Sequence, residues 1–160
     1  MTPDIRPLES RDKPAVLQIL NSLPEFEPHE VVIAEELIDA YLRDGEKSGY
    51  VLMVYEVDSL VQGYICYGPT PLTRGTWDIY WIAVSPSMKG KGLGTALMNK
   101  AEENIVKAGG NLVIVETSSK PLYENTRKFY SSRNYSVICR IKDFYSKGDD
   151  KVMLGKWFEG

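Results

Sequence analysis

A glycine-rich turn is the part of this sequence whose residue types point most directly to chemistry. Residues 89–95 read Lys-Gly-Lys-Gly-Leu-Gly-Thr and stand between an apolar stretch and a segment with helical periodicity. At the start of a helix, backbone N–H groups lack partners and the helix dipole is positive, so a phosphate or pyrophosphate can bind there. Glycine lets the anion reach the backbone and permits positive φ angles. The turn therefore predicts a phosphate site, and a solvated loop is the alternative.

Two other phosphate-binding motifs fit the turn less well. The P-loop pattern G-x-x-x-x-G-K-[ST] is absent from the sequence. The dinucleotide fingerprint G-x-G-x-x-G is met by Gly90 and Gly92, but Thr95 replaces its third glycine. Five residues separate Val84 from Gly90, whereas that fingerprint follows its strand directly. Glu116 resembles the ribose-binding acid of such folds, so a nicotinamide-dependent oxidoreductase stays a distant alternative.

Hydrophobic periodicity predicts the elements that must position this turn. In order, they are a helix between Pro14 and Pro24, a helix between the linker 25–30 and Gly45, a hairpin of strands 50–57 and 61–67, a strand 76–84, a long helix ended by Gly109-Gly110, a strand 112–115, a helix 123–132, and a hairpin of strands 135–145 and 151–158. The apolar face expected on the second helix consists of Ile33, Leu37, Tyr41 and Leu42. Two helices are thus expected before the first strand.

The order of these elements predicts the fold class. Antiparallel hairpins flank one strand–helix–strand crossover. We therefore expect an α/β (α+β) fold with a mixed, mainly antiparallel sheet flanked by helices and one β-α-β crossover.

Composition excludes several classes of protein and site. The 160 residues are expected to form a single domain, 1–160. With one histidine, His29, and two distant cysteines, Cys66 and Cys139, we expect no metal site. A net charge of −3 argues against a nucleic-acid partner. The absence of a long apolar stretch and of a signal peptide predicts a cytoplasmic protein with no membrane partner.

Two segments resemble the GNAT superfamily of acyl-CoA-dependent N-acyltransferases. Residues 82–97 resemble its strand-then-[QR]-x-x-G-x-[GA] signature, with Lys89 where glutamine or arginine is usual. Residues 123–135 resemble N-x-x-A-x-x-[FL]-Y-x-x-x-G-[FY], and the departures, in order, are Tyr123, Thr126 and Asn134. The predicted element order agrees with that family over essentially the whole chain.

The resemblance implies a place for acetyl-CoA as co-substrate. The strand 76–84 is expected to splay from the next strand, and main-chain groups at such an opening need partners. The backbone of Ile82, Ala83 and Val84 would contact the pantetheine arm and the acyl carbonyl. The pyrophosphate would lie on Lys89, Gly90, Lys91, Gly92, Leu93, Gly94 and Thr95.

The resemblance also implies an N-acetyltransferase that joins acetyl-CoA and a primary amine of a small molecule or peptide in a ternary complex. Tyr130 stands where the family's motif places its general acid. A neutral phenol suits this role, since it can protonate a leaving thiolate. The general base is Asp78 or Glu116, with bulk water as the alternative. A non-catalytic acyl-CoA-binding sensor or scaffold is the alternative function. By analogy, a homodimer through the C-terminal strands is a further expectation. No motif in the sequence identifies the acceptor amine.

Overall fold

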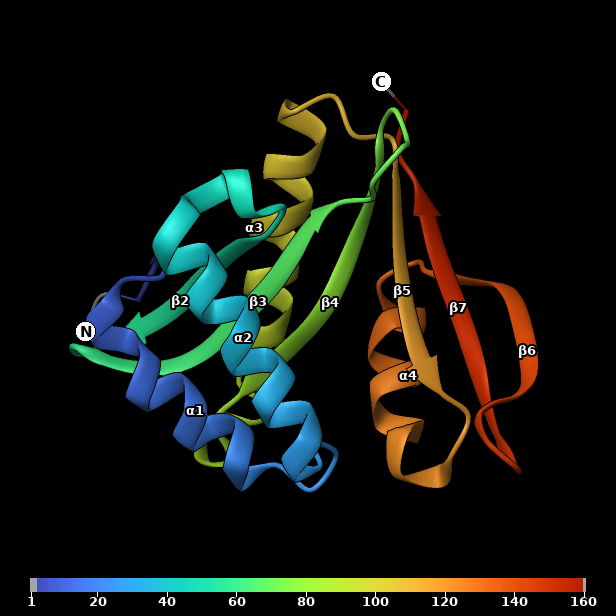
Figure 1. Cartoon of the computed structure of the whole chain (residues 1–160), viewed down its shortest axis with the longest axis horizontal. Coiled ribbons are helices and arrows are strands. Elements are labelled where there is room, and N and C mark those ends of the chain that lie inside the picture. Colours follow the sequence, from blue (N-terminus) through green and yellow to red (C-terminus); the bar gives the residue numbers. More distant parts are fainter. Residues whose placement is uncertain (1–2, 160) are drawn as a thin grey trace.

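A computed structural model describes residues 3–159 of the chain (Figure 1). The helices and strands, in order, are β1 (Asp4–Pro7), α1 (Lys13–Ser22), α2 (Pro28–Asp44), β2 (Val51–Val57), β3 (Leu60–Pro69), β4 (Thr76–Val84), α3 (Leu93–Lys107), β5 (Leu112–Ser118), α4 (Glu124–Ser132), β6 (Ser136–Ser146) and β7 (Asp149–Trp157). The strands form one sheet in the order β1-β2-β3-β4-β5-β7-β6. Within the described residues, β4 and β5 pair in parallel and every other neighbouring pair is antiparallel. The predicted mixed, mainly antiparallel sheet with one crossover is confirmed.

Strand β1 was not predicted, so the expectation that two helices precede the sheet is wrong. Its four residues carry no alternating pattern, and the strand is held by pairing with β2. It is also held by Arg6, whose guanidinium contacts Asp12 at 2.7 Å and Glu56 at 3.0 Å. Long-range charge pairs of this kind leave no periodic signal in the sequence.

The buried face of α2 differs from the predicted one. Val31, Ala34 and Ile38 are buried, whereas Ile33 is 49% exposed. The other three predicted residues, Leu37, Tyr41 and Leu42, pack against the core from its margin. The helix begins at Pro28, inside the predicted linker, and Ile33 lines a cavity described below.

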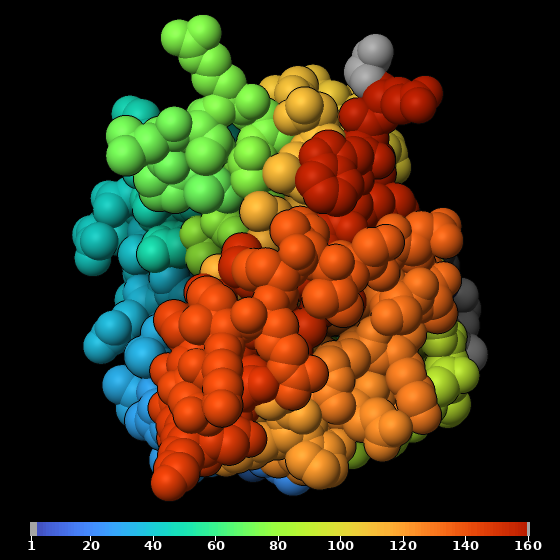
Figure 2. Space-filling view, turned by 90° about the vertical axis from the view of Figure 1, so that its right-hand side faces the viewer, coloured from blue at the N-terminus to red at the C-terminus, as the bar shows by residue number. Residues whose placement is uncertain are grey.

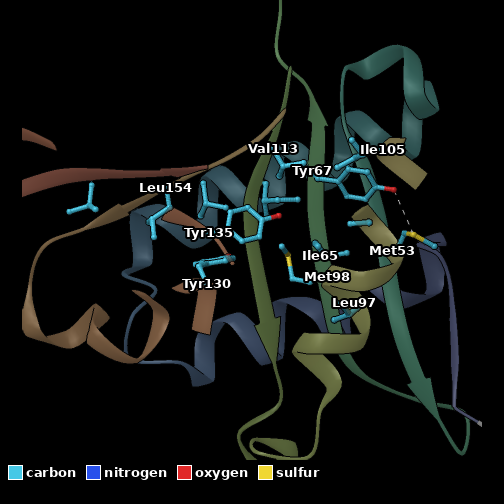
Figure 3. Close-up of a cluster of buried hydrophobic side chains, with 14 residues drawn as sticks. Met53, Ile65, Tyr67, Leu97, Met98, Ile105, Val113, Tyr130, Tyr135 and Leu154 are labelled. Atoms are coloured by element: carbon cyan, nitrogen blue, oxygen red, sulfur yellow. Dashed lines mark hydrogen bonds between the residues drawn. The ribbon is translucent and has the colours of Figure 1, made fainter. Parts of the chain in front are cut away.

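Two hydrophobic cores lie on the two faces of the sheet. Successive residues of β2 alternate between them, since Leu52 and Val54 belong to the core beneath α1 and α2 and Met53 to the core beneath α3 and α4. Figure 3 shows the second core, in which Tyr130 and Tyr135 lie beside each other with ring centroids 5.8 Å apart. No helix in residues 3–159 has the length and apolar character needed to span a membrane.

Candidate active site

The sheet opens between β4 and β5. Pairing covers only 76–79 of β4 with 112–115 of β5, and the two strands then diverge (Figure 1). The pairing of β4 with β3 shifts by one residue at this point, since Ile79 faces Tyr67 while Trp81 faces Cys66. Tyr80 is therefore the extra residue of a β-bulge. Bulges bend a strand and increase its twist, and this one lies where β4 leaves β5. The splay that the sequence resemblance implied is confirmed.

The glycine-rich turn forms a row of free backbone donors next to this opening. Gly90 and Gly92 have φ angles of 77° and 86°, which glycine adopts without strain, and Gly92 caps α3. Within residues 3–159, the N–H groups from Gly90 to Thr95 donate no hydrogen bond to a protein acceptor. Added Cβ atoms at Gly90 and Gly92 would meet nothing within 4 Å. The turn is therefore an open anion cradle at the N-terminus of a helix of 15 residues.

A cavity of about 610 Å³ occupies the opening of the sheet. Its walls come from the start of α2, from β4, β5 and α4, and from the β6–β7 hairpin. Among the predicted residues, Ile82, Glu116 and Tyr130 line it. The volume lies within the range of roughly 300–1,000 Å³ that is usual for small-molecule sites.

The remaining predicted cofactor residues lie beside the cavity and do not line it. The side chain of Ala83 is buried and that of Val84 is half-buried. The turn approaches the cavity through Lys89, whose ammonium lies 3.7 Å from the carboxylate of Glu25 on the cavity wall. Lys91 is exposed.

Tyr130 presents its ring to the cavity from α4. Its side chain is 4% exposed, and within the described residues its hydroxyl makes no hydrogen bond. Burial raises the pKa of the Tyr130 phenol, so the group stays protonated through the neutral range. A buried phenol with a free donor, facing a cavity, is suited to protonate a group that binds there.

The two candidate bases lie in different surroundings. Glu116 lines the same cavity as Tyr130, and its carboxylate is 2.9 Å from the ammonium of Lys151. Asp78 lines an adjacent cavity of about 320 Å³ and accepts a hydrogen bond of 2.7 Å from Thr70. Burial is the largest cause that raises the pKa of Asp78, and the nearby Glu116 adds to it. The structure thus brings Tyr130 together with Glu116 but not with Asp78.

Several cavity residues were not predicted. The hydroxyl of Tyr123, which stands at the family motif's asparagine position, donates a 2.8 Å hydrogen bond to the carbonyl of Glu25 and joins the turn before α4 to the α1–α2 linker. Tyr145 of β6 also lines the cavity. Apart from the place of Tyr123 in the motif, nothing in the sequence distinguishes these two residues from the other tyrosines. Asn134, at the motif's glycine position, has a φ of 70°, a left-handed conformation that asparagine tolerates.

Comparison with known proteins identifies the family. The sequence model of the acetyltransferase (GNAT) family matches residues 7–135. The chain belongs to this family. It is therefore an acetyltransferase by family, and its sheet excludes the dinucleotide-binding alternative, which needs a mostly parallel sheet.

Solved structures agree with this assignment of the GNAT chain. It is 37% identical to a protein from Desulfovibrio desulfuricans described as a GNAT acetyltransferase, with a TM-score of 0.95 over 98% of this chain and 99% of that one. The ribosomal-protein-S18-alanine N-acetyltransferase from Escherichia coli shares 18% identity and a TM-score of 0.76 over 99% and 97% of the chains. The PaiA N-acetyltransferase from Thermoplasma acidophilum, solved with coenzyme A, shares 16% identity and a TM-score of 0.77 over 99% of this chain and 100% of that one. The two latter likenesses concern the fold. No curated protein sequence matches the chain significantly.

Proposed function

We propose that the protein is an N-acetyltransferase that transfers the acetyl group of acetyl-CoA to a primary amine in a ternary complex. The observation that supports this most strongly is the row of free N–H groups from Gly90 to Thr95 beside a cavity that is lined by Tyr130, whose ring is buried and whose accessible hydroxyl has no hydrogen-bond partner among residues 3–159. The first feature suits a pyrophosphate and the second a leaving thiolate. The complex of the Thermoplasma relative with coenzyme A supports the choice of co-substrate.

Acetyl-CoA fits this site in terms of donors and space. The cradle supplies N–H donors for the pyrophosphate, and the unpaired edge of β4 at Ile82–Val84 supplies main-chain groups for the pantetheine arm and the thioester carbonyl. The cofactor supplies the acyl group and the thiol leaving group.

The protein's own groups then move two protons. The acceptor must attack as a neutral amine, so Glu116, or Asp78, takes a proton from the ammonium directly or through water. The amine nitrogen attacks the carbonyl carbon, the C–S bond breaks, and Tyr130 donates its hydroxyl proton to the sulfur. Cys66 is buried and Cys139 lies outside the cavity lining, so neither is placed for an acyl-enzyme relay.

Glu116 is our first candidate for the base, since it shares the cavity with Tyr130. The Glu116→Gln variant is expected to lower kcat/KM about 10²-fold at neutral pH. The loss should shrink at alkaline pH, where the amine is already neutral. The dependence of kcat/KM on pH is measured for Glu116→Gln, for Asp78→Asn and for a control, Glu124→Gln. Glu124 is an exposed acid of α4. A profile of Glu116→Gln that equals that of the control would exclude Glu116 as the base.

A thiol-release assay tests the proposed function. Acetyl-CoA and a panel of primary amines, including diamines and peptides, are mixed with the protein, and free CoA is measured. We expect amine-dependent release. Tight binding of acetyl-CoA in calorimetry, with no release for any amine, would instead support the non-catalytic sensor.

We also propose that the protein forms a homodimer through β6. This strand lies at the edge of the sheet and is exposed along its whole length (Figure 2). Its exposed apolar side chains are Val137, Ile138, Ile141 and Phe144. An unpaired apolar edge strand is a template for pairing with a second copy about a twofold axis.

Light scattering after size exclusion tests the dimer. We expect a dimeric mass for the wild type and a monomeric mass for Ile141→Asp, because the charge would be buried at the new interface. The control is Val106→Asp, at an exposed apolar position of α3 that leaves β6 intact. A monomeric wild type at micromolar concentration would overturn the proposal.

A further inference from the structure

The smaller cavity adjoins the larger one and shares much of its wall with it. The shared residues are Glu30, Tyr80, Trp81, Glu116 and Tyr145. Asp78 and Ile79 complete the smaller cavity. The α2 start, β4, β5 and β6 therefore converge on a side chamber that continues from the space in which Tyr130 lies.

Two carboxylates of this chamber differ from the other acids of the site. Glu25, Glu116 and Asp149 each lie within 4.0 Å of a lysine ammonium. By contrast, Glu30 and Asp78 form no ion pair within the part of the chain that the structure describes. Both are half-buried, and burial raises the pKa of each carboxyl. The cationic groups nearest to them act without forming an ion pair, His29 on Glu30 and Lys151 on Asp78. An incoming cation would lower the remaining cost of burying these carboxylates.

Aromatic residues line the same chamber as these carboxylates. Tyr80 and Trp81 come from the bulged part of β4, and Tyr145 comes from β6. The faces of aromatic rings attract alkylammonium groups, and the attraction grows when the cation is desolvated. Carboxylates and aromatic rings together thus favour a primary ammonium on a short apolar chain.

Tyr130 is 4% exposed, and its hydroxyl, which is accessible from the larger cavity, has no hydrogen-bond partner among residues 3–159. This is an independent sign that a ligand enters the larger of the joined cavities. On the proposed function, the reacting nitrogen of the acceptor lies in the larger cavity near Tyr130.

We propose that the side chamber of Glu30, Asp78, Tyr80, Trp81 and Tyr145 binds a second ammonium group of the same acceptor. This inference rests on the proposed function and narrows it: the acceptor is an aliphatic diamine or polyamine. The ammonium that remains charged anchors the molecule between Glu30 and Asp78. The other ammonium loses a proton and attacks the thioester.

Steady-state kinetics with matched amines test the chamber. Butane-1,4-diamine and butylamine have the same chain and differ in one ammonium group. We expect kcat/KM for the diamine to exceed that for butylamine by at least about tenfold, since the diamine can make hydrogen bonds to the charged groups of the chamber that butylamine cannot make. Equal values for the two amines, or a better rate with a peptide that has only one amine, would overturn the inference.

Two variants assign the anchor. In Glu30→Gln and in Asp78→Asn, the ratio of kcat/KM for the diamine to kcat/KM for butylamine should fall severalfold towards one, because KM for the diamine rises. Glu36→Gln, an exposed acid of α2 outside both cavities, is the control and should keep the wild-type ratio. If Asp78 acts as the base instead, Asp78→Asn would lower kcat for both amines and leave the ratio unchanged. Thermal unfolding checks that each variant is folded.

Failure of the inference can be distinguished from failure of the proposed function. If acetyl-CoA binds but neither amine is acetylated, the proposed function is wrong. If both amines are acetylated with the same kcat/KM, only the second ammonium site is wrong. Calorimetry of butane-1,4-diamine with the protein saturated with CoA gives a readout without turnover, in which Glu30→Gln should weaken binding severalfold.

Discussion

The Gly92→Glu variant is expected to lose acetyl-CoA binding by about 10³-fold or more. A glutamate at the N-cap of α3 would place a negative charge where the pyrophosphate binds and would displace it from the free N–H groups of the cradle. Losing two or three charge-assisted hydrogen bonds, at about 1.5–3 kcal/mol each, accounts for a loss of this size. Calorimetry with acetyl-CoA measures the affinity.

Two control variants separate charge from backbone strain. Gly92→Ala introduces a side chain at the same φ of 86° without the charge, at a conformational cost of about 1–3 kcal/mol. Gly109→Glu introduces the same charge at a φ of 88° at the other end of α3, where a Cβ meets nothing within 4 Å. Both should fold less stably than the wild type and still bind acetyl-CoA. Wild-type affinity in Gly92→Glu would show that the pyrophosphate binds elsewhere.

The Tyr130→Phe variant is expected to lower kcat about 10²-fold while the Kd for acetyl-CoA changes less than about twofold. The substitution removes only the hydroxyl, which is the group we expect to protonate the leaving thiolate. The ring, which packs against Phe129 and Tyr135, is retained, so the hydrophobic core should not change. Steady-state thiol release and calorimetry measure the two quantities separately.

Tyr135→Phe is the matched control for Tyr130→Phe. The Tyr135 hydroxyl donates a 2.7 Å hydrogen bond to Glu102, whose carboxylate also lies 3.3 Å from the ammonium of Lys156. Loss of the Tyr135 hydroxyl should lower the Tm, because the buried carboxylate of Glu102 loses a hydrogen-bond donor. It should leave kcat per folded molecule unchanged. A Tyr130→Phe enzyme with wild-type kcat would remove Tyr130 from the mechanism.

The fold and the cofactor cradle could be predicted from the sequence because their signals are local. Gly90 and Gly92 indicate positive φ angles and open backbone, and both are found. The Asp58-Ser59 turn has the left-handed conformation that a two-residue hairpin needs. The periodic segments gave the correct type for each helix and strand that they covered. The order of elements then restricted the topology to a mixed sheet.

The acceptor side of the site could not be predicted in the same way, because long-range packing creates it. The cavity brings together the start of α2, the bulge at Tyr80 and the exposed strand β6, which are far apart in the chain. No spacing rule links Glu30 to Asp78, and whether a carboxylate has a lysine partner appears only in three dimensions. The bulge itself arises from the register with β3, which the sequence of β4 alone does not reveal.

Mass spectrometry of a mixture of the protein, acetyl-CoA and a panel of primary amines tests direct acetyl transfer most directly. We predict that at least one amine gains a single acetyl group and that the mass of the protein stays unchanged at every time point. A protein that becomes acetylated and then loses the group to the amine would contradict direct attack. Amines that stay unmodified while acetyl-CoA is bound would contradict the transfer itself.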